Sequence, residues 1–321
     1  MLKVSYKIKI GNNTITGGKQ TNLLEIKSHA SLSIPVNSCT IVLGSPQNLT
    51  IAIEDPISVE LGYDNKQTLV FTGKLSDVEW GIDRVRIDGL SSIQNLTVAR
   101  FNLLYEKSSA GDIVKDFLNK GKLKADKIEN GIKFSTYTLG DFMSAYDHLQ
   151  RLAQQCGFDI YANTKDKIVF AKYKAKNTHE FKYGEDILGF SLDSARIGVE
   201  KVEIYGESPA SGGQGEKASS WLTKKEVKGS AGSGTTLRLV DPTARTQAIA
   251  QKIAKGVLAN MCQKQRGRMK VLGNSNVKLG DGVKVSKMPI KDQNGTFKVT
   301  GVSHRLNRRS GFFTVIDWEE S

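Results

Sequence analysis

Histidine and cysteine are the side chains of this 321-residue chain best suited to metal binding or nucleophilic chemistry. The sequence contains His29, His148, His179, His304, Cys39, Cys156 and Cys262. No two of them stand at the short spacings typical of zinc ligands. The cysteines are odd in number, far apart and set in apolar or helical contexts, so we expect buried free thiols and no disulfide framework. These residues predict no catalytic, cofactor-binding or metal site.

Other motifs that carry a chemical mechanism are missing too. The run Gly229-Ser-Ala-Gly-Ser-Gly lacks the Lys-Ser/Thr ending of a phosphate-binding loop and the strand–helix setting of a dinucleotide fingerprint. No Gly-x-Ser-x-Gly nucleophile elbow occurs. Two separated carboxylates of a glycosidase would leave no sequence motif. The chain as a whole nevertheless predicts a protein that is not an enzyme and takes no small-molecule substrate.

The composition favours a globular protein rich in β structure, with 39% hydrophobic residues and 31 glycines. No run of about 18 apolar residues occurs, so we expect no membrane span. Residues 1–10 alternate charged and apolar side chains, unlike a signal peptide, which predicts synthesis and folding in the cytoplasm.

The net charge of +13 is concentrated near the C-terminus. Between Lys264 and Arg309 there are twelve Lys or Arg residues against Asp281 and Asp292 alone. Such a field favours an acidic partner, either nucleic acid or protein. A solvated outer face of alternating strands explains the same pattern.

Alternating apolar and polar residues predict many short strands at both ends of the chain. The expected strands are residues 2–10, Leu23–Ile34, Cys39–Leu43, Ile57–Tyr63, Thr68–Trp80, Arg84–Leu90, Arg268–Leu272, Val283–Lys287, Thr296–Leu306 and Phe312–Glu319. Asp64-Asn65 predicts a turn, and a change of face along Thr296–Leu306 predicts a bulge at Gly301.

Short phrases near the C-terminus repeat phrases of the first hundred residues. They are Asp281-Gly-Val-Lys-Val, Thr300-Gly301 and Ile316-Asp317, against Asp55-Pro-Ile-Ser-Val, Thr72-Gly73 and Ile87-Asp88. Their spacings differ by only one or two residues. The sequence therefore predicts two copies of one antiparallel β unit, each a barrel or closed sandwich.

The residues between the two units predict a smaller α+β region. Ser109 with Asp112, and Thr138 with Asp141, read as helix starts, and Gly157 reads as a helix end. Phe142, Tyr146, Leu149, Leu152, Ala153 and Cys156 share one face of the second helix and should be core. Phe158–Ala162 and Lys167–Tyr173 predict a hairpin. Residues 207–236 predict a flexible loop, and Asp241-Pro242 predicts the start of a helix that runs to about Gln263.

The fold class expected is thus α+β and mainly β. We predict a first β-barrel at residues 1–103 and an inserted α+β domain at 104–179. The second β-barrel should comprise residues 180–206 and 266–321, with a flexible loop and helix insertion at 207–265.

Several of these segments resemble the phage late control gene D family, the baseplate hub proteins of contractile tails. The similar stretches are Ser109–Leu118, Thr138–Ala153, residues 157–161 and 168–170, residues 279–283, 295–299 and 302–304, and residues 311–314. The resemblance implies two barrels like the tail-tube protein, a homotrimer with pseudo-six-fold symmetry, and a role joining the hexameric inner tube to a trimeric spike. It further implies other baseplate proteins as partners, no cofactor, and assembly into a phage tail or contractile injection particle.

Two other functions stay open: a nucleic-acid-binding β-barrel protein, or a tail protein that binds or degrades the cell wall. For a hub, we expect Arg305, Arg308 and Arg309 to project from a rim and meet acidic groups of a tube or spike subunit. Trp221, in the predicted mobile loop, is a fourth candidate partner-interface residue.

Overall fold

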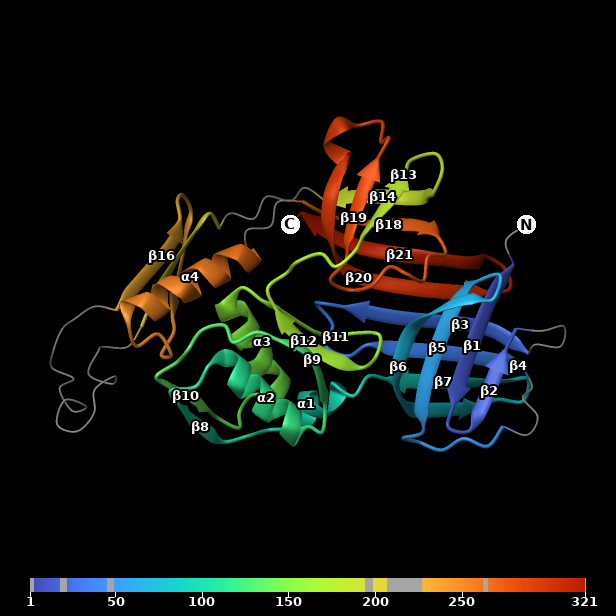
Figure 1. Ribbon diagram of the computed structural model, residues 1–321, viewed down its shortest axis with the longest axis horizontal. Coiled ribbons are helices and arrows are strands. Elements are labelled where there is room, and N and C mark those ends of the chain that lie inside the picture. Colours follow the sequence, from blue (N-terminus) through green and yellow to red (C-terminus); the bar gives the residue numbers. More distant parts are fainter. Residues whose placement is uncertain are drawn as a thin grey trace.

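The computed structural model describes residues 3–17, 22–44, 49–193, 199–206, 227–261 and 265–320. Figure 1 shows a broad β region formed by the two ends of the chain, a helical region beside it, and a small sheet with one helix at the far end. Of the helices within these ranges, none is long and apolar enough to cross a membrane. The fold is mainly β, as the alternation predicted.

A 13-stranded sheet holds most of both chain ends. The first strand unit consists of β1 (Val4–Ile10), β2 (Asn13–Thr16), β3 (Leu23–Ser31), β4 (Ser38–Gly44), β5 (Pro56–Tyr63), β6 (Lys66–Trp80) and β7 (Arg84–Leu90). The second strand unit consists of β13 (Thr178–Lys182), β14 (Ile187–Asp193), β18 (Arg266–Leu272), β19 (Gly282–Ser286), β20 (Gly295–Asn307) and β21 (Gly311–Glu320). A 3₁₀ turn at Lys291–Gln293 precedes β20.

The two units share one pattern of strand pairing. In the first unit the order is β3-β4-β7-β6-β5, and in the second it is β14-β18-β21-β20-β19, with every neighbouring pair antiparallel. β3 and β14 each carry a bulge, at Leu24 and Leu188, and β6 and β20 each carry one, at Ser76 and Thr300. The outer strands differ, because β1 runs antiparallel to β5 whereas β13 runs parallel to β19.

Hydrogen bonds fix which residues of the two units correspond. The amide of Leu75 donates to Asp55 O at 2.9 Å, and the amide of Val299 donates to Asp281 O at 3.0 Å. Leu75 therefore corresponds to Val299. The sequence repeat had aligned Thr72-Gly73 with Thr300-Gly301, and this alignment is wrong by four residues. Thr72-Gly73 lies before Leu75 in β6, whereas Thr300-Gly301 lies after Val299 in β20. The predicted bulge is present, and its unpaired residue is Thr300, one position before Gly301, since the register shifts between Val299 and Gly301.

β20 joins the two units into one sheet. Its first residues pair with β19, and after the bulge its residues Gly301 to Asn307 pair with Ser31 to Glu25 of β3. Figure 1 shows this junction as red strands lying directly against blue ones. Leu306 and Phe312 of the second unit are buried in the apolar core of the first unit. The junction is thus sealed by side chains as well as by backbone hydrogen bonds.

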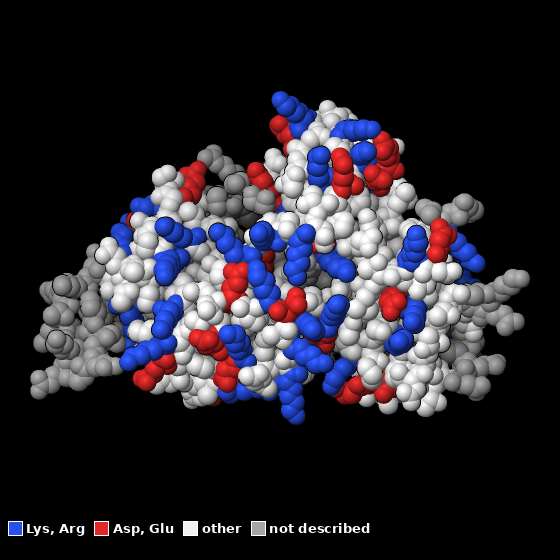
Figure 2. Space-filling model, viewed as in Figure 1, with Lys and Arg blue, Asp and Glu red and all other residues white. Residues whose placement is uncertain are grey.

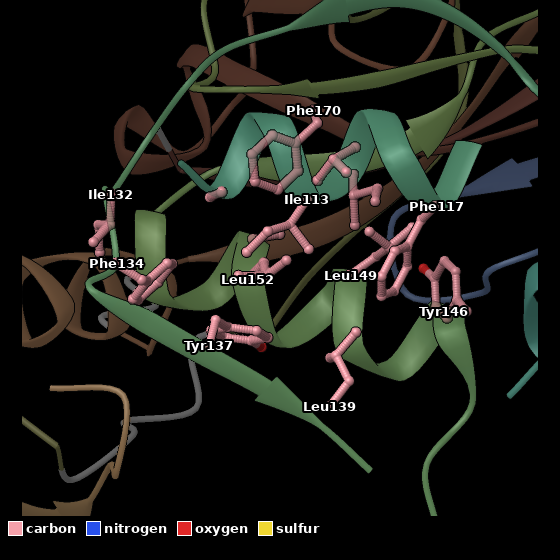
Figure 3. Close-up of a cluster of buried hydrophobic side chains, with 14 of the residues drawn as sticks. Ile113, Phe117, Ile132, Phe134, Tyr137, Leu139, Tyr146, Leu149, Leu152 and Phe170 are labelled. Atoms are coloured by element: carbon pink, nitrogen blue, oxygen red, sulfur yellow. The ribbon is translucent and has the colours of Figure 1, made fainter. Parts of the chain in front are cut away.

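The insert between the units runs from Leu103 to Ala171. It contains β8 (Leu103–Glu106), α2 (Ala110–Lys120), β9 (Lys124–Ile128), β10 (Thr136–Leu139), α3 (Ala145–Cys156), β11 (Asp159–Ala162) and β12 (Lys167–Ala171), after a short helix α1 (Gln94–Val98). The capping box at Ser109 and Asp112 is confirmed, as is the end of α3 at Gly157 in left-handed conformation. Figure 3 shows Leu149 and Leu152 of α3 facing Ile113 and Phe117 of α2.

The start of α3 differs from its prediction. Ser144, not Thr138, caps the helix and forms a capping box with Asp147. Thr138 lies in β10 instead, and Phe142 precedes the helix with 77% of its surface exposed, so its assignment to the core is wrong. The physical reason is that Thr138 is paired with Leu104 in the β10–β8 ladder, so its extended backbone cannot begin a helix, although Thr138 and Asp141 have the same box spacing as Ser144 and Asp147.

A third sheet comprises β15 (Lys201–Tyr205), β16 (Lys228–Gly232) and β17 (Thr236–Val240). It packs with α4 (Gln247–Met261) onto the same core as the insert. The assignment of residues 199–205 to the second barrel is therefore wrong. Residues 207–226, most of the predicted flexible loop, lie outside the described residues, and β16 occupies much of its remainder. α4 also starts five residues later than predicted, because Asp241 is buried and its carboxylate binds Thr243.

Candidate assembly interface

The cysteines and histidines serve packing between strands and helices. Burial raises the pKa of the Cys39 thiol well above its ordinary value and that of Cys156 to about 11, so the nucleophilic thiolate is disfavoured at both. Within the described ranges, no group of three or more His, Cys, Asp or Glu side chains is placed to hold a metal ion. Cys262 lies outside those ranges.

The four histidines make short contacts with neighbouring elements. His304 is buried between strands with Nδ1 3.0 Å from Thr314 Oγ1, and burial lowers its pKa to about 4. His29 Nδ1 lies 2.7 Å from Ser303 Oγ, across the β3–β20 junction. His148 Nε2 lies 3.1 Å from Gly140 O, and His179 Nε2 lies 3.0 Å from the Asp281 carboxylate. The two hydroxyl partners, Ser303 and Thr314, belong to the paired strands β20 and β21, so these contacts join neighbouring strands of the sheet.

The β3–β20 junction places the three predicted interface arginines in different settings. Arg305 lies within β20, opposite Lys27, and its exposed guanidinium forms an ion pair with Glu25 of the same chain. Arg308 Nε donates to Leu23 O at 3.0 Å, and Arg309 is exposed in the turn before β21. The turn therefore carries Arg308 and Arg309, whereas Arg305 already has an acidic partner within the chain. Trp221 lies outside the described residues.

A buried ion centre connects the second strand unit to the insert, and the sequence did not reveal it. Lys298 Nζ of β20 lies 2.7 Å from Asp159 Oδ1 of β11 and 3.0 Å from Glu319 Oε1 of β21. The Lys298 side chain is 10% exposed. Burial disfavours its charge, but the two carboxylates outweigh burial and raise the pKa of Lys298. Burial raises the pKa of Asp159 as well, against the opposing effect of Lys298. Lys298 stands between the apolar residues Phe297 and Val299, as an outward-facing lysine of a strand would, so no sequence signal marks it.

A second polar contact, also not foreseen from the sequence, holds α4 and the small sheet to α3. The buried Asp241 carboxylate accepts a hydrogen bond from Gln155 Nε2 at 2.6 Å and lies 3.4 Å from Arg151 Nη2. Gly256 of α4 lies so close to α3 that a Cβ there would be 2.3 Å from Gln155 O. Small residues permit this helix crossing, and Asp241 fixes its orientation.

A cleft of about 770 Å³ lies between the β region and the insert. Its walls include Gln150 and Gln154 of α3, Arg266 and Arg268 of β18, and Lys298. Acidic side chains accompany the basic ones, since Arg266 pairs with Asp193 at 3.0 Å and Arg268 with Asp317 at 2.6 Å. The cleft walls therefore carry paired charges, among them Asp159 and Glu319, which both contact Lys298.

The basic residues of the C-terminal strands mostly have acidic partners in the chain. Beyond the pairs already named, Lys284 lies 3.6 Å from Glu180 and Lys287 lies 2.5 Å from Glu185. Figure 2 shows Lys and Arg side chains interspersed with Asp and Glu over the visible face. Phe297 and Phe312 are buried in the cores. Phe313 is half-buried, with Lys270 Nζ 4.1 Å from its ring centroid.

Comparison with known proteins places the chain in a family. Residues 2–308 match the family model described as Alg8 N-terminal domain, and the chain belongs to that family. The matching model is therefore not that of the late control gene D family, which several segments resemble. No curated protein sequence matches the chain.

Solved structures of tail proteins share the fold. The 43 kDa tail protein of prophage MuSo2 from Shewanella oneidensis is 13% identical, with a TM-score of 0.75 over 99% of this chain and 98% of that one. The tail protein from Neisseria meningitidis MC58 is 16% identical, with a TM-score of 0.73 over 99% and 97%. The E. coli c3393 protein, a type VI secretion component with structural similarity to the T4 tail proteins gp27 and gp5, is 11% identical, with a TM-score of 0.62 over 98% and 76%. At these identities the likeness establishes the fold.

Proposed function

We propose that this chain is a structural subunit of a phage tail or related contractile injection system. In that particle it acts as a hub that joins the inner tube to the spike as a homotrimer. The fold it shares with two prophage tail proteins and a type VI secretion component supports the general role.

The observation that carries the hub proposal is the correspondence between the two strand units. Five strands of each unit have the same order, directions and bulge positions. Three such chains present six similar units, so a ring of three can match a six-fold tube on one side and a three-fold spike on the other. We take both units as tube-like barrels, with Leu103–Ala171 and the small sheet with α4 as insertions between their strands.

The rim arginines are the proposed contact with an acidic tube or spike subunit. Arg308 and Arg309 lie in the turn between β20 and β21 with exposed side chains, as a rim contact requires. Arginine pairs with carboxylates through two parallel hydrogen bonds, and such pairs strengthen when an interface excludes water.

Mass measurement under native conditions tests the proposal. A hub predicts a stable species of three times the 35.2 kDa chain mass, with no hydrolysis of purified peptidoglycan. A species that stays monomeric at all accessible concentrations contradicts the hub. Peptidoglycan hydrolysis would instead favour the cell-wall-degrading tail protein.

A further inference from the structure

β14 and the end of β6 each have an edge without a partner strand among the described residues. The corresponding strands of the other unit, β3 and β20, are paired with each other. β14 is hydrogen-bonded to β18 on one side, and nothing among the described residues pairs with its other side. Beyond its bulge, residues Asp77 to Trp80 of β6 pair only with β7 within the same ranges. The counterpart of β14 is β3, and the counterpart of this part of β6 is the end of β20. Those two counterparts form the junction inside the chain.

The correspondence of the two units gives the register in which the open edges would meet. Matching bulges place Leu23 of β3 at Ile187 of β14, and Val299 of β20 at Leu75 of β6. Counted along the chain, the junction pair Leu306–Ile26 then corresponds to Ile82, which lies in the turn directly after the end of β6, and Phe190. The pair His304–Ser28 corresponds to Trp80 facing Leu192.

If the open edges lack a partner strand, their side chains should be more exposed than the corresponding side chains of the β3–β20 junction. Leu306 is 9% exposed and Ile26 is 0% exposed, because they cover each other in the core of the first unit. Ile82 is fully exposed, and Phe190 is half-buried beside Trp318 in the core of the second unit. By the same correspondence, Ile82 of another chain would enter that core next to Phe190.

The neighbouring position pair shows the same difference. His304 and Ser28 are each 3% exposed at the junction. Trp80 is 58% exposed, and Leu192 is half-buried. Large apolar side chains on a strand with an open hydrogen-bonding edge are a strong signal for pairing with another chain. Trp80, Phe190 and Leu192 on the open edges are apolar, and so is Ile82 in the turn that follows β6.

One pair on the other face of the edges is acidic on both sides. Glu79 would face Asp193, where the junction has Ser303 and His29. Each acid has an arginine at hand: Asp193 lies 3.0 Å from Arg266, and Glu79 lies opposite Arg86 in the hairpin. Arg86 already forms an ion pair with Asp88 at 2.8 Å, so Glu79 and Asp193 repel each other across the contact and the apolar pairs must outweigh that repulsion.

We propose that the β14 edge of one chain pairs antiparallel with the β6 edge of a second copy of the same chain. Trp80 faces Leu192, and Ile82 packs on Phe190. Because the two edges differ, each chain uses both, and the contact is head-to-tail, which closes into a ring or grows into a filament. The pairing itself follows from the strand correspondence. Only its closure at three chains rests on the proposed hub function.

Engineered disulfides test the register. In Trp80→Cys with Leu192→Cys, oxidation should link chains covalently, because residues directly opposite on paired strands have Cβ atoms about 4.5–5.5 Å apart. Glu79→Cys with Leu192→Cys is the off-register control, since those side chains point to opposite faces of the sheet. The wild-type chain and each single variant control for the native cysteines. Linked species in the matched double variant alone support the pairing.

A second variant keeps the test independent of disulfide geometry. Ile82→Asp should weaken self-association at least about thirtyfold, because it places a charge in an apolar interface. Since Ile82 is fully exposed within the chain, the thermal unfolding of the monomer should not change. Ile290→Asp is the matched control, at a side chain that is 59% exposed in a turn away from both edges.

The possible outcomes separate the pairing from the hub. A wild-type trimer that gives no matched cross-link and is unaffected by Ile82→Asp overturns the edge pairing and leaves the hub. A cross-linked ladder extending beyond three chains supports the pairing and overturns the three-fold hub. A chain that remains monomeric and unlinked overturns both.

Discussion

Replacement of Lys298 by methionine tests whether the buried ion centre holds the insert against the second strand unit. Methionine keeps most of the packing of the lysine stem and removes only the ammonium group. The Asp159 carboxylate is then left without its 2.7 Å partner, at a side chain only 13% exposed. Removing one partner of a buried ion pair costs about 3–5 kcal/mol, because the other charge remains buried. We expect a loss of about 3 kcal/mol, at the lower end, because Glu319 is 31% exposed and Asp159 can take up a proton.

The pH dependence of this loss has a definite sign. Burial already raises the pKa of Asp159 in the folded chain, and removal of Lys298 raises it further, because Lys298 opposes the shift. In the variant, the folded state therefore binds more protons than the unfolded state at pH values between the two Asp159 pKa values. The variant accordingly gains stability relative to wild type as the pH falls through that range. Its deficit should be smaller at pH 5 than at pH 7.5.

Urea unfolding at both pH values is the assay. Lys284→Met is the matched control, because its exposed pair with Glu180 is worth at most about 1 kcal/mol. Adding Asp159→Asn to Lys298→Met should recover part of the loss, since no uncompensated charge then remains. The reasoning is refuted if Lys298→Met is no less stable than Lys284→Met at pH 7.5, or if its deficit grows on acidification.

Three further expectations concern other parts of the chain. Gly256→Ala should cost about 2 kcal/mol in thermal unfolding, because its Cβ would meet the backbone of α3, whereas Lys255→Ala on the exposed face should change little. The pKa of His304 is about 4 in the folded chain and 6.5 in the unfolded chain. Between pH 7 and pH 4 the wild-type chain should therefore lose up to about 3 kcal/mol of unfolding free energy relative to His304→Gln. Equal pH profiles of the two chains would contradict this. Joint replacement of Arg305, Arg308 and Arg309 by Ser should leave the oligomer mass unchanged and abolish docking to tube or spike. Unchanged docking at physiological salt would remove these residues from the proposed rim contact.

Local chemistry accounts for what the sequence determined by itself. Alternation located most strands of both units, including β7 with its observed bounds but not β2 or β13, because one face of each strand must be apolar. Asp64-Asn65 predicted its turn, and both residues have positive φ. Capping at Ser109 and termination at Gly157 depend only on neighbouring backbone groups, so they too were predictable.

Tertiary structure decided which strands meet and which charges are buried. The apolar alternation of Lys201–Tyr205 suits any sheet, and only packing against α4 assigned it to the small sheet instead of the second unit. The Thr-Gly repeat gave an alignment of the two units that is wrong by four residues. Two residues are too few to define a strand register, whereas the backbone hydrogen bonds define it. Lys298 and Asp159 are 139 positions apart, and no local pattern records such a pairing. The open edges of β6 and β14 could not be predicted from local patterns either, because a strand edge is defined only by the pairing of all the other strands.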